Sequence, residues 1–143
     1  MAGSGKMRYK QVVFLDTGAL IAVHDENDSY WKEALEKLKR LRKSSPVFVT
    51  TDYVVDETYT GLLKKAGYGS VMEFDKTLSE GRWHIERMNE GRFVRAQEVF
   101  RRFNKDKEWS FTDCTSYVVM KELKIGTAFT FDQNFVQMGF KIL

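Results

Sequence analysis

The sequence predicts an α/β fold in which helices cover both faces of a mostly parallel central sheet. Short apolar runs of the kind found in strands buried on both faces occur at residues 12–15, 47–50 and 127–131. The stretches between these runs carry apolar residues at helical spacing. Strands that alternate with helices form parallel sheets, and such sheets bind ligands at the carboxyl ends of their strands.

The expected elements follow one another in the order β-α-β-α-α-β-α-α-β-β. The expected strands are residues 12–15, 47–50, 83–88, 127–131 and 140–143. The expected helices are residues 31–43, 52–66, 71–78, 93–103 and 110–123.

Local signals set the boundaries in the first half of the chain. Asn27 or Asp28 can cap the helix at residues 31–43, and Pro46 follows its end. Thr51 or Asp52 can cap the next helix, which stops before Gly67 because glycine readily ends a helix. The sequence therefore gives both of these helices a start signal and a stop signal.

The second half of the chain is interpreted in the same way. Gly81 closes the short helix at residues 71–78. The run at residues 83–88 alternates like a strand, but it is short and polar, which is typical of a sheet edge. Ser110 opens a helix whose third residue is Asp113, the arrangement of a capping box.

Length and composition indicate one domain. The chain has 143 residues, 43% of them hydrophobic, which suffices for a single core and is short for two. We expect a flexible leader at residues 1–10 and a single domain at residues 11–143. No apolar run reaches the roughly 18 residues that a membrane helix needs. The lone Cys114 excludes an internal disulfide and fits a reducing cytoplasm.

Basic residues gather in two clusters, although the net charge is only +3. The first, basic cluster 1, consists of Lys37, Lys39, Arg40, Arg42 and Lys43. The second, basic cluster 2, consists of Arg101, Arg102, Lys105 and Lys107. Such clusters suit a nucleic-acid backbone, and they are equally compatible with solvated helix faces.

Four acidic residues lie where an expected strand ends or near the start of an expected helix: Asp16, Glu57, Asp113 and Asp132. In a parallel sheet these positions meet at one edge. Carboxylates gathered there repel one another by about 3 kcal/mol per pair at about 5 Å, unless a cation lies among them. Oxygen ligands without His or Cys favour Mg²⁺ or Mn²⁺, and such a site can cleave phosphodiesters.

Each acid also has a purely structural interpretation. Asp16 or Asp132 could start a turn after its strand, and Asp113 could serve only as the acid of the capping box. For Glu57 the helical spacing places the side chain toward the apolar face, where a carboxylate needs a functional reason. The set of four carries more weight than any single member.

Four segments in this order resemble the PIN domain family, in particular the VapC-like toxin ribonucleases. They are Val13-Phe14-Leu15-Asp16-Thr17-Gly18-Ala19-Leu20, Asp56-Glu57-Thr58-Tyr59-Thr60, Ser110-Phe111-Thr112-Asp113-Cys114-Thr115-Ser116, and Phe129-Thr130-Phe131-Asp132-Gln133-Asn134-Phe135 with Gly139-Phe140. The resemblance implies a three-layer α/β/α sandwich with strand order 3-2-1-4-5. One departure is Tyr30-Trp31, which stands where relatives often have histidines.

The resemblance also implies a function. It predicts an endoribonuclease that cleaves single-stranded RNA and holds Mg²⁺ or Mn²⁺ through Asp16, Glu57, Asp113 and Asp132. Thr17 and Thr112 would supply supporting hydroxyls. A homodimer and a small antitoxin partner are further expectations of this kind. The alternatives are a PIN-fold module that binds RNA or protein without cutting it, and a phosphatase with Asp16 as nucleophile, for which Gly18 lacks the second carboxylate.

Overall fold

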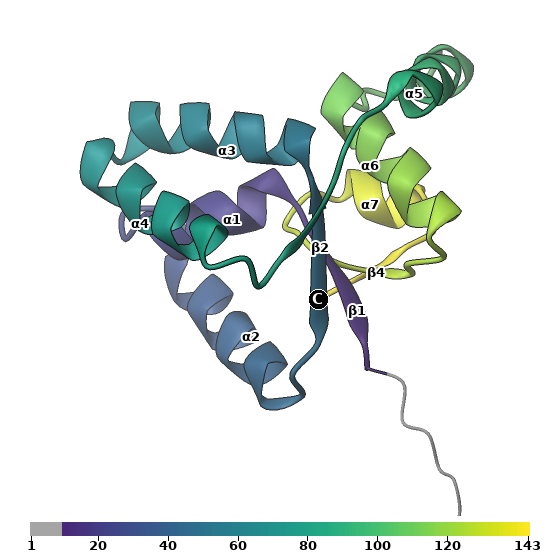
Figure 1. The fold of residues 1–143 in the computed structure, drawn as a ribbon. Helices are drawn as coiled ribbons and strands as arrows, with labels where there is room; N and C mark the ends of the chain where they lie inside the picture. The colour runs from purple at the N-terminus through teal and green to yellow at the C-terminus, as the bar shows by residue number, and fades with distance from the viewer. Residues whose placement is uncertain (1–9) are drawn as a thin grey trace, which may run out of the picture.

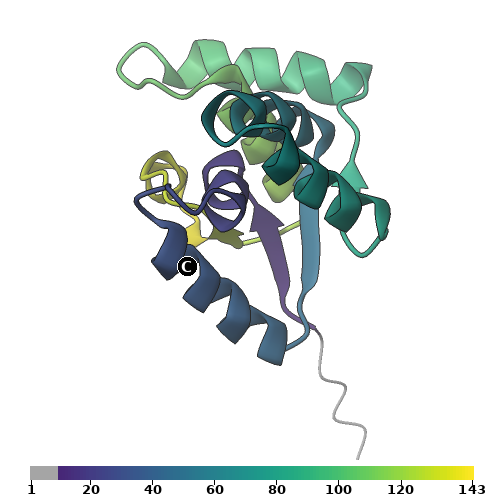
Figure 2. The ribbon, with the colours of Figure 1, turned by 90° about the vertical axis from the view of Figure 1, so that its left-hand side faces the viewer.

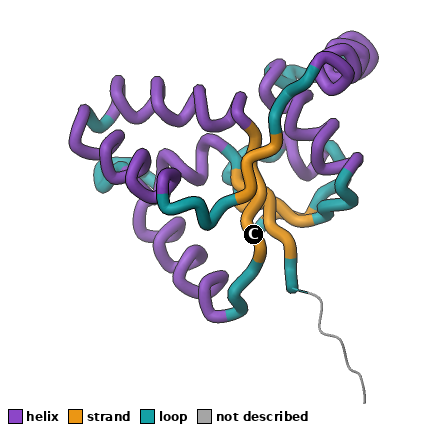
Figure 3. Tube along the Cα trace, viewed as in Figure 1, coloured by secondary structure: helices purple, strands orange, loops and turns teal. Residues whose placement is uncertain are grey.

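A five-stranded, all-parallel sheet with the order β3-β2-β1-β4-β5 forms the centre of the computed structural model, which describes residues 10–143 (Figures 1 and 3). The strands of this part of the chain are β1 (Val12–Leu15), β2 (Val47–Thr51), β3 (His84–Glu86), β4 (Thr127–Phe129) and β5 (Lys141–Ile142). The parallel sheet and the strand order 3-2-1-4-5 are thus confirmed. The short strand β3 lies at the sheet edge, as its polarity predicts.

Helices form the two outer layers. Those of the described range are α1 (Thr17–His24), α2 (Trp31–Lys43), α3 (Asp52–Lys65), α4 (Tyr68–Ser79), α5 (Glu90–Phe103), α6 (Phe111–Glu122) and α7 (Asn134–Gln137). Helices α1 to α4 lie on one side of the sheet, and α5 to α7 lie on the other (Figures 1 and 2). The three-layer sandwich predicted from the sequence is therefore correct.

The central strand β1 explains why the sheet forms at this point of the chain. Its residues Val13, Phe14 and Leu15 are almost completely inaccessible to solvent, because β2 and β4 flank the strand and helices cover both faces. Phe14 pairs with Val49 of β2 and with Ala128 of β4. Burial on both faces is what a continuous apolar strand requires.

Two helices were missed by the sequence analysis. Helix α1 is apolar on all sides, and four of its eight residues are buried, so it lacks the periodic pattern of an amphipathic helix. Helix α7 has only four residues, too few for a periodicity to appear. The expected strand at residues 127–131 was too long, since β4 ends at Phe129. Thr130, Phe131 and Asp132 therefore belong to the connection between β4 and α7.

Two of the three predicted helix caps are present. The Thr51 hydroxyl accepts a hydrogen bond from Val54 N at 3.1 Å and caps α3. Gly67, after α3, has φ of +91°, a left-handed conformation that glycine adopts without strain. At α6 both hydrogen bonds of the capping box between Ser110 and Asp113 are present.

The expected cap of α2 by Asn27 or Asp28 is wrong, because the N-cap residue is Tyr30, whose side chain makes no capping bond, while Asp28 accepts a hydrogen bond from Tyr30 N in the turn before the helix.

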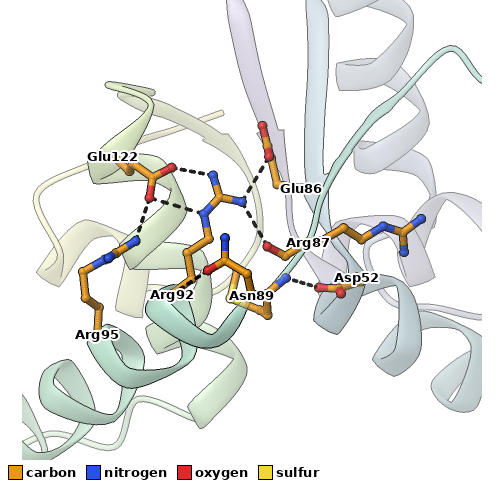
Figure 4. Close-up of polar contacts among 8 residues, drawn as sticks. Asp52, Glu86, Arg87, Asn89, Arg92, Arg95 and Glu122 are labelled. Atoms are coloured by element: carbon orange, nitrogen blue, oxygen red, sulfur yellow. Dashed lines mark hydrogen bonds and ion pairs between the residues drawn. The ribbon is translucent and has the colours of Figure 1, made fainter.

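An ion-pair network joins the outer helix α5 to the rest of the molecule (Figure 4). The guanidinium of Arg92, 8% exposed, pairs with Glu122 at the end of α6 and with Glu86 of β3, and it also donates to Arg87 O. The pKa of Glu122 is lowered, chiefly by the hydrogen bond from Arg92. One buried cation thus ties α5, α6 and the edge strand together.

No helix in the part of the chain that the structure covers combines the length and apolarity needed to cross a membrane. Most of the leader expected at residues 1–10 lies outside the described residues, which begin at Lys10. The single domain expected at residues 11–143 stays a prediction.

Candidate metal-dependent active site

The first acid, Asp16, lies directly after the central strand and is 5% exposed. Its backbone N–H donates to Phe129 O at 3.1 Å, which extends the pairing of β1 with β4 by one residue. Its carboxylate accepts a hydrogen bond at Oδ2 from the Thr130 hydroxyl, over 2.7 Å. The sheet register therefore fixes Asp16 beside the carboxyl end of β4.

The connection that follows β4 brings Asp132 to the same edge. Asp132 N donates to the Thr130 hydroxyl at 3.0 Å, so a single hydroxyl contacts both acidic residues. Asp132 Oδ1 accepts from Asn134 N at 2.9 Å, and this contact begins α7. Asp132 thus starts a turn after its strand, as the structural interpretation of the sequence expected, and it also lies next to Asp16.

Asp113 comes to this edge from the start of α6 and is 7% exposed. Its Oδ2 atom accepts two hydrogen bonds, both at 3.1 Å, from Ser110 N and from Asn134 Nδ2. The first bond belongs to the capping box, and the second crosses to α7. The structural role of Asp113 and its place among the acids therefore coexist.

Glu57 is connected to the other acids through Thr17. The Thr17 hydroxyl donates to Glu57 Oε1 at 2.9 Å, and Thr17 is the residue next to Asp16. The expectation that Glu57 lies on the packed face of its helix is wrong, because the side chain is exposed, like that of Asp56. Thr58, the neighbour on the other side, is fully buried and takes the place in the helix interface.

The pKa values of two of these acids are raised, as expected for carboxylates that are buried close to other carboxylates. The pKa of Asp16 is raised from 3.8 to about 7, first by burial and then by the charges of Asp113 and Asp132, while the Thr130 hydrogen bond partly offsets the shift. The pKa of Asp113 is also raised, by burial and by Asp132, against the hydrogen bond from Asn134. These three carboxylates therefore interact across three different chain segments.

The carboxylates of the described residues lie too far apart for three of them to ligate one metal ion together. Among residues 10–143, no three His, Cys, Asp or Glu side chains lie close enough together to hold one ion in the geometry seen here. The Thr112 carbonyl accepts a hydrogen bond from the Thr115 hydroxyl at 2.6 Å, and the role of Thr112 as a supporting hydroxyl stays a prediction. Thr17 does contact an acid of the set.

Two residues that orient the carboxylates were missed by the sequence analysis. Thr130 binds Asp16 and Asp132, and Asn134 binds Asp113 and Asp132. The sequence contains a local signal for both, because Thr and Asp side chains commonly accept a hydrogen bond from the backbone two residues later. The spacing Thr130, Asp132, Asn134 fits two such turns in succession.

The two basic clusters lie differently with respect to the acids. Basic cluster 2 belongs to the end of α5 and the connection to α6, which reaches the acidic edge, since Asn134 Nδ2 donates to Glu108 O in that connection. Basic cluster 1 lies along α2, and its last members stand just before β2, toward the amino edge of the sheet. Lys37, the first member of basic cluster 1, is an exception, because its ammonium group lies 5.1 Å from the ring centroid of Phe131, the residue before Asp132. Basic cluster 2 and Lys37 are therefore better placed for a substrate bound at the acids than the rest of basic cluster 1.

Comparison with known proteins places these features in a family. A PIN domain family model matches residues 13–141. The 23S rRNA-specific endonuclease VapC20 of Mycobacterium tuberculosis is 29% identical over 130 residues, which are 90% of this chain and 95% of the relative. The crystal structure of that VapC20, described as a sarcin-ricin loop cleaving toxin, has a TM-score of 0.80 with the same coverage of both chains.

A more distant structure shares the fold. FitAcB from Neisseria gonorrhoeae has a TM-score of 0.60 at 14% identity and covers 92% of this chain and 96% of its own. The family model spans nearly the whole described chain, and the residues that suggested the resemblance lie within its limits. The resemblance to VapC-like PIN proteins is thus confirmed, and the chain belongs to the PIN domain family.

Proposed function

We propose that the protein is an endoribonuclease that requires Mg²⁺ or Mn²⁺ and hydrolyses phosphodiester bonds of single-stranded RNA. The observation that carries the proposal is the approach of Asp16, Asp113 and Asp132 to one another from three chain segments at the carboxyl edge of the sheet. Burial of like charges destabilises a fold, so such a cluster needs a compensating cation. Glu57 would complete the ligand set.

The residues present fit a small, hard cation. All four acids offer carboxylate oxygens, the ligands that Mg²⁺ and Mn²⁺ prefer over nitrogen and sulfur. Ligation of one ion by three or four of them requires the side chains to close in from their present arrangement. Bound there, a divalent cation supplies Lewis acidity and lowers the pKa of an attacking water.

The other contacts hold the acids in place. Thr130 and Asn134 hold three of the carboxylates through hydrogen bonds, and Thr17, the neighbour of Asp16 in the chain, donates a hydrogen bond to Glu57. Basic cluster 2 provides charges for the RNA backbone beside the acidic edge, since phosphate contacts dominate non-specific affinity. These groups position substrate and ligands.

The relative named above suggests a more specific substrate and setting. We propose a structured ribosomal RNA loop as the first substrate to test, because VapC20 is described as specific for 23S rRNA. We also propose that the chain is a cytoplasmic toxin that forms a homodimer and is silenced by a small antitoxin. The lone buried Cys114 agrees with a reducing compartment.

A PIN-fold module that binds RNA without cutting it is the second candidate. A groove used only for binding would be more stable if neutral residues replaced its mutually repelling acids. This chain nevertheless has carboxylic acids at the buried positions Asp16 and Asp113. That comparison favours the enzyme.

A cleavage assay with matched acid variants tests the proposal. Purified protein is incubated with labelled single-stranded RNA and with a sarcin-ricin loop RNA, with Mn²⁺ or with a chelator. The variants Asp16→Asn, Glu57→Gln, Asp113→Asn and Asp132→Asn are compared with two controls. Asp25→Asn removes another buried acid, 6% exposed, and Asp56→Asn removes the exposed neighbour of Glu57.

We expect cleavage by the parent in Mn²⁺ only, a loss of at least a hundredfold in each of the four variants, and near-parental rates in both controls. RNA binding without cleavage by the parent in Mn²⁺ would support the binding module. Cleavage by Asp16→Asn at the parental rate would contradict the proposed site.

A further inference from the structure

An aromatic pair stands beside the acidic edge. The rings of Tyr30 and Phe131 stack with centroids 4.3 Å apart and planes inclined by only 9°. Phe131 directly precedes Asp132 in the chain, and consecutive Cα atoms are about 3.8 Å apart. In Figure 2 the start of α2 accordingly lies beside the segment between β4 and α7. The stack is thus one residue away from a proposed metal ligand.

Tyr30 is the outer member of the pair. Its side chain is 46% exposed, among the larger values for the aromatic residues of the described chain, whereas Phe131 is only partly accessible. Phe131 also contacts Phe129 edge-on at 6.1 Å and has the Lys37 ammonium 5.1 Å from its ring centroid. With Phe131 held from several directions, Tyr30 is the ring that remains open to solvent.

The backbone holds Tyr30 in a defined position. Tyr30 N donates to Asp28 Oδ1 at 2.8 Å, and Asp28 N donates to Asp25 O at 2.9 Å. Tyr30 O accepts from Ala34 N at 2.8 Å in the first turn of α2. The ring is therefore presented by an ordered turn and a helix start, which lowers the entropy lost when a flat ligand stacks on it.

The side of Tyr30 that does not face Phe131 matches a nucleobase in shape and chemistry. Bases of single-stranded nucleic acids stack on exposed aromatic side chains without regard to sequence, because every base has a π-face. Lys37 adds a positive charge beside the stack. Its ammonium group is fixed by Glu33 at 3.3 Å and by the carbonyl of Leu143 at 2.7 Å.

We propose that Tyr30 forms a base-stacking subsite for the RNA substrate. A base that continues the Tyr30–Phe131 stack places an adjoining phosphodiester at the acidic cluster, because Asp132 follows Phe131 directly. The subsite orients single-stranded RNA and contributes to affinity without reading a particular base. This inference rests on the proposed function for its ligand, and its geometry is independent of the metal.

The test combines protein variants with abasic RNA. A short fluorescent single-stranded RNA is titrated in Mn²⁺ buffer into Asp16→Asn protein, which we expect not to cleave it, and into Asp16→Asn proteins that also carry Tyr30→Ala, Tyr30→Trp or Tyr68→Ala. Tyr68 is the matched control, since it is 70% exposed and lies on α4. Each protein is also titrated with RNAs that lack one base at successive positions. Thermal unfolding shows that every variant is folded.

Because base–aromatic stacking contributes substantially to single-strand affinity, Tyr30→Ala should weaken binding about tenfold, while Tyr30→Trp and Tyr68→Ala should leave it within about twofold. Removal of the base at one RNA position should weaken binding to the protein that retains Tyr30 by about the same factor. The same abasic RNA should bind the Tyr30→Ala protein no more weakly than the intact RNA does. Cleavage by the Tyr30→Ala variant with its acids intact should show a raised KM with a smaller change in kcat.

Other outcomes separate this inference from the proposed function. Unchanged binding by Tyr30→Ala, or an abasic penalty of equal size with and without Tyr30 at every position, overturns the subsite even if the parent cleaves RNA. The parent could fail to cleave RNA while Tyr30→Ala still weakens RNA binding and one abasic position weakens binding only to the protein that retains Tyr30. In that case the subsite stands and the nuclease proposal fails.

Discussion

The Thr130 hydroxyl donates a hydrogen bond to Asp16 Oδ2 over 2.7 Å, and both groups are almost completely buried. The bond joins residues 114 positions apart in the sequence, across the carboxyl ends of β1 and β4. The same hydroxyl accepts from Asp132 N. One side chain that cannot ionise thus holds two acidic residues of the proposed site in register.

Removal of the Thr130 hydroxyl should destabilise the fold when Asp16 is charged. Thr130→Val keeps the shape but leaves a buried carboxylate without its donor, so we expect a loss of about 1–3 kcal/mol of unfolding free energy at pH 8 without metal. The loss should be smaller at pH 5, where Asp16 is protonated. Thr130→Ser, which retains the hydroxyl, is the control. Equal losses for Val and Ser in urea unfolding would show that the methyl group contributes as much as the hydroxyl, and no loss in Thr130→Val would contradict the prediction.

Asp16 should make the metal-free protein less stable as the pH rises. Its pKa is 3.8 as a free group and about 7 in the fold, raised mainly by burial. Between these values the folded protein holds a proton that the unfolded chain has released, so stability falls as pH rises through this window. Above pH 7 the full loss of unfolding free energy is reached, and it amounts to up to about 4 kcal/mol.

Asp16→Asn removes this titration. In metal-free buffer the variant should melt at or above the parental temperature at pH 8, and its stability between pH 4 and pH 7 should lose the contribution of Asp16. A parental slope in Asp16→Asn, measured by urea unfolding at successive pH values, would refute the assignment.

The capping box of α6 should contribute to both stability and activity. Ser110→Ala removes the hydroxyl that accepts from Asp113 N at 3.0 Å, which costs about 1 kcal/mol. Asn89→Ala removes the cap of α5, far from the acids in the chain, at a similar cost. RNA cleavage should fall several-fold in Ser110→Ala and stay near parental in Asn89→Ala. Equal activities would mean that cap geometry does not influence Asp113.

The Arg92 network should matter for stability alone. Arg92→Met leaves Glu86 and Glu122 without their nearly buried partner, and we expect a loss of about 2 kcal/mol, reduced from the fully buried case because both acids are partly exposed. Arg95→Met, at a side chain that is 51% exposed, should cost less than about 1 kcal/mol. Urea unfolding measures both losses, and cleavage per folded molecule should not change. A strongly reduced rate in folded Arg92→Met would tie the network to function.

The sequence was sufficient for the parts of the fold that local patterns determine. The buried strand before Asp16, the Thr51 cap and the Ser110 capping box all follow from residues close together in the chain. Helix α1 did not, because burial on every side removes the amphipathic period by which a helix is recognised.

The acids were recognisable as a set because parallel strands deliver their carboxyl ends to one edge, and Asp16 and Asp132 do meet there. Their supporting contacts were not recognisable. The bond from Asn134 to Asp113 joins residues 21 apart, and its existence depends on how α7 docks against α6. The exposure of Glu57 depends likewise on the packing of α3, which buries its neighbour Thr58.

The most direct test of the central claim is an equilibrium titration of Mn²⁺ into the metal-free protein, followed by calorimetry. We predict that the parent, Asp25→Asn and Asp56→Asn bind Mn²⁺ alike, and that Asp16→Asn, Asp113→Asn and Asp132→Asn each bind at least tenfold more weakly. Parental Mn²⁺ affinity in folded Asp16→Asn or Asp113→Asn would contradict a shared cation site.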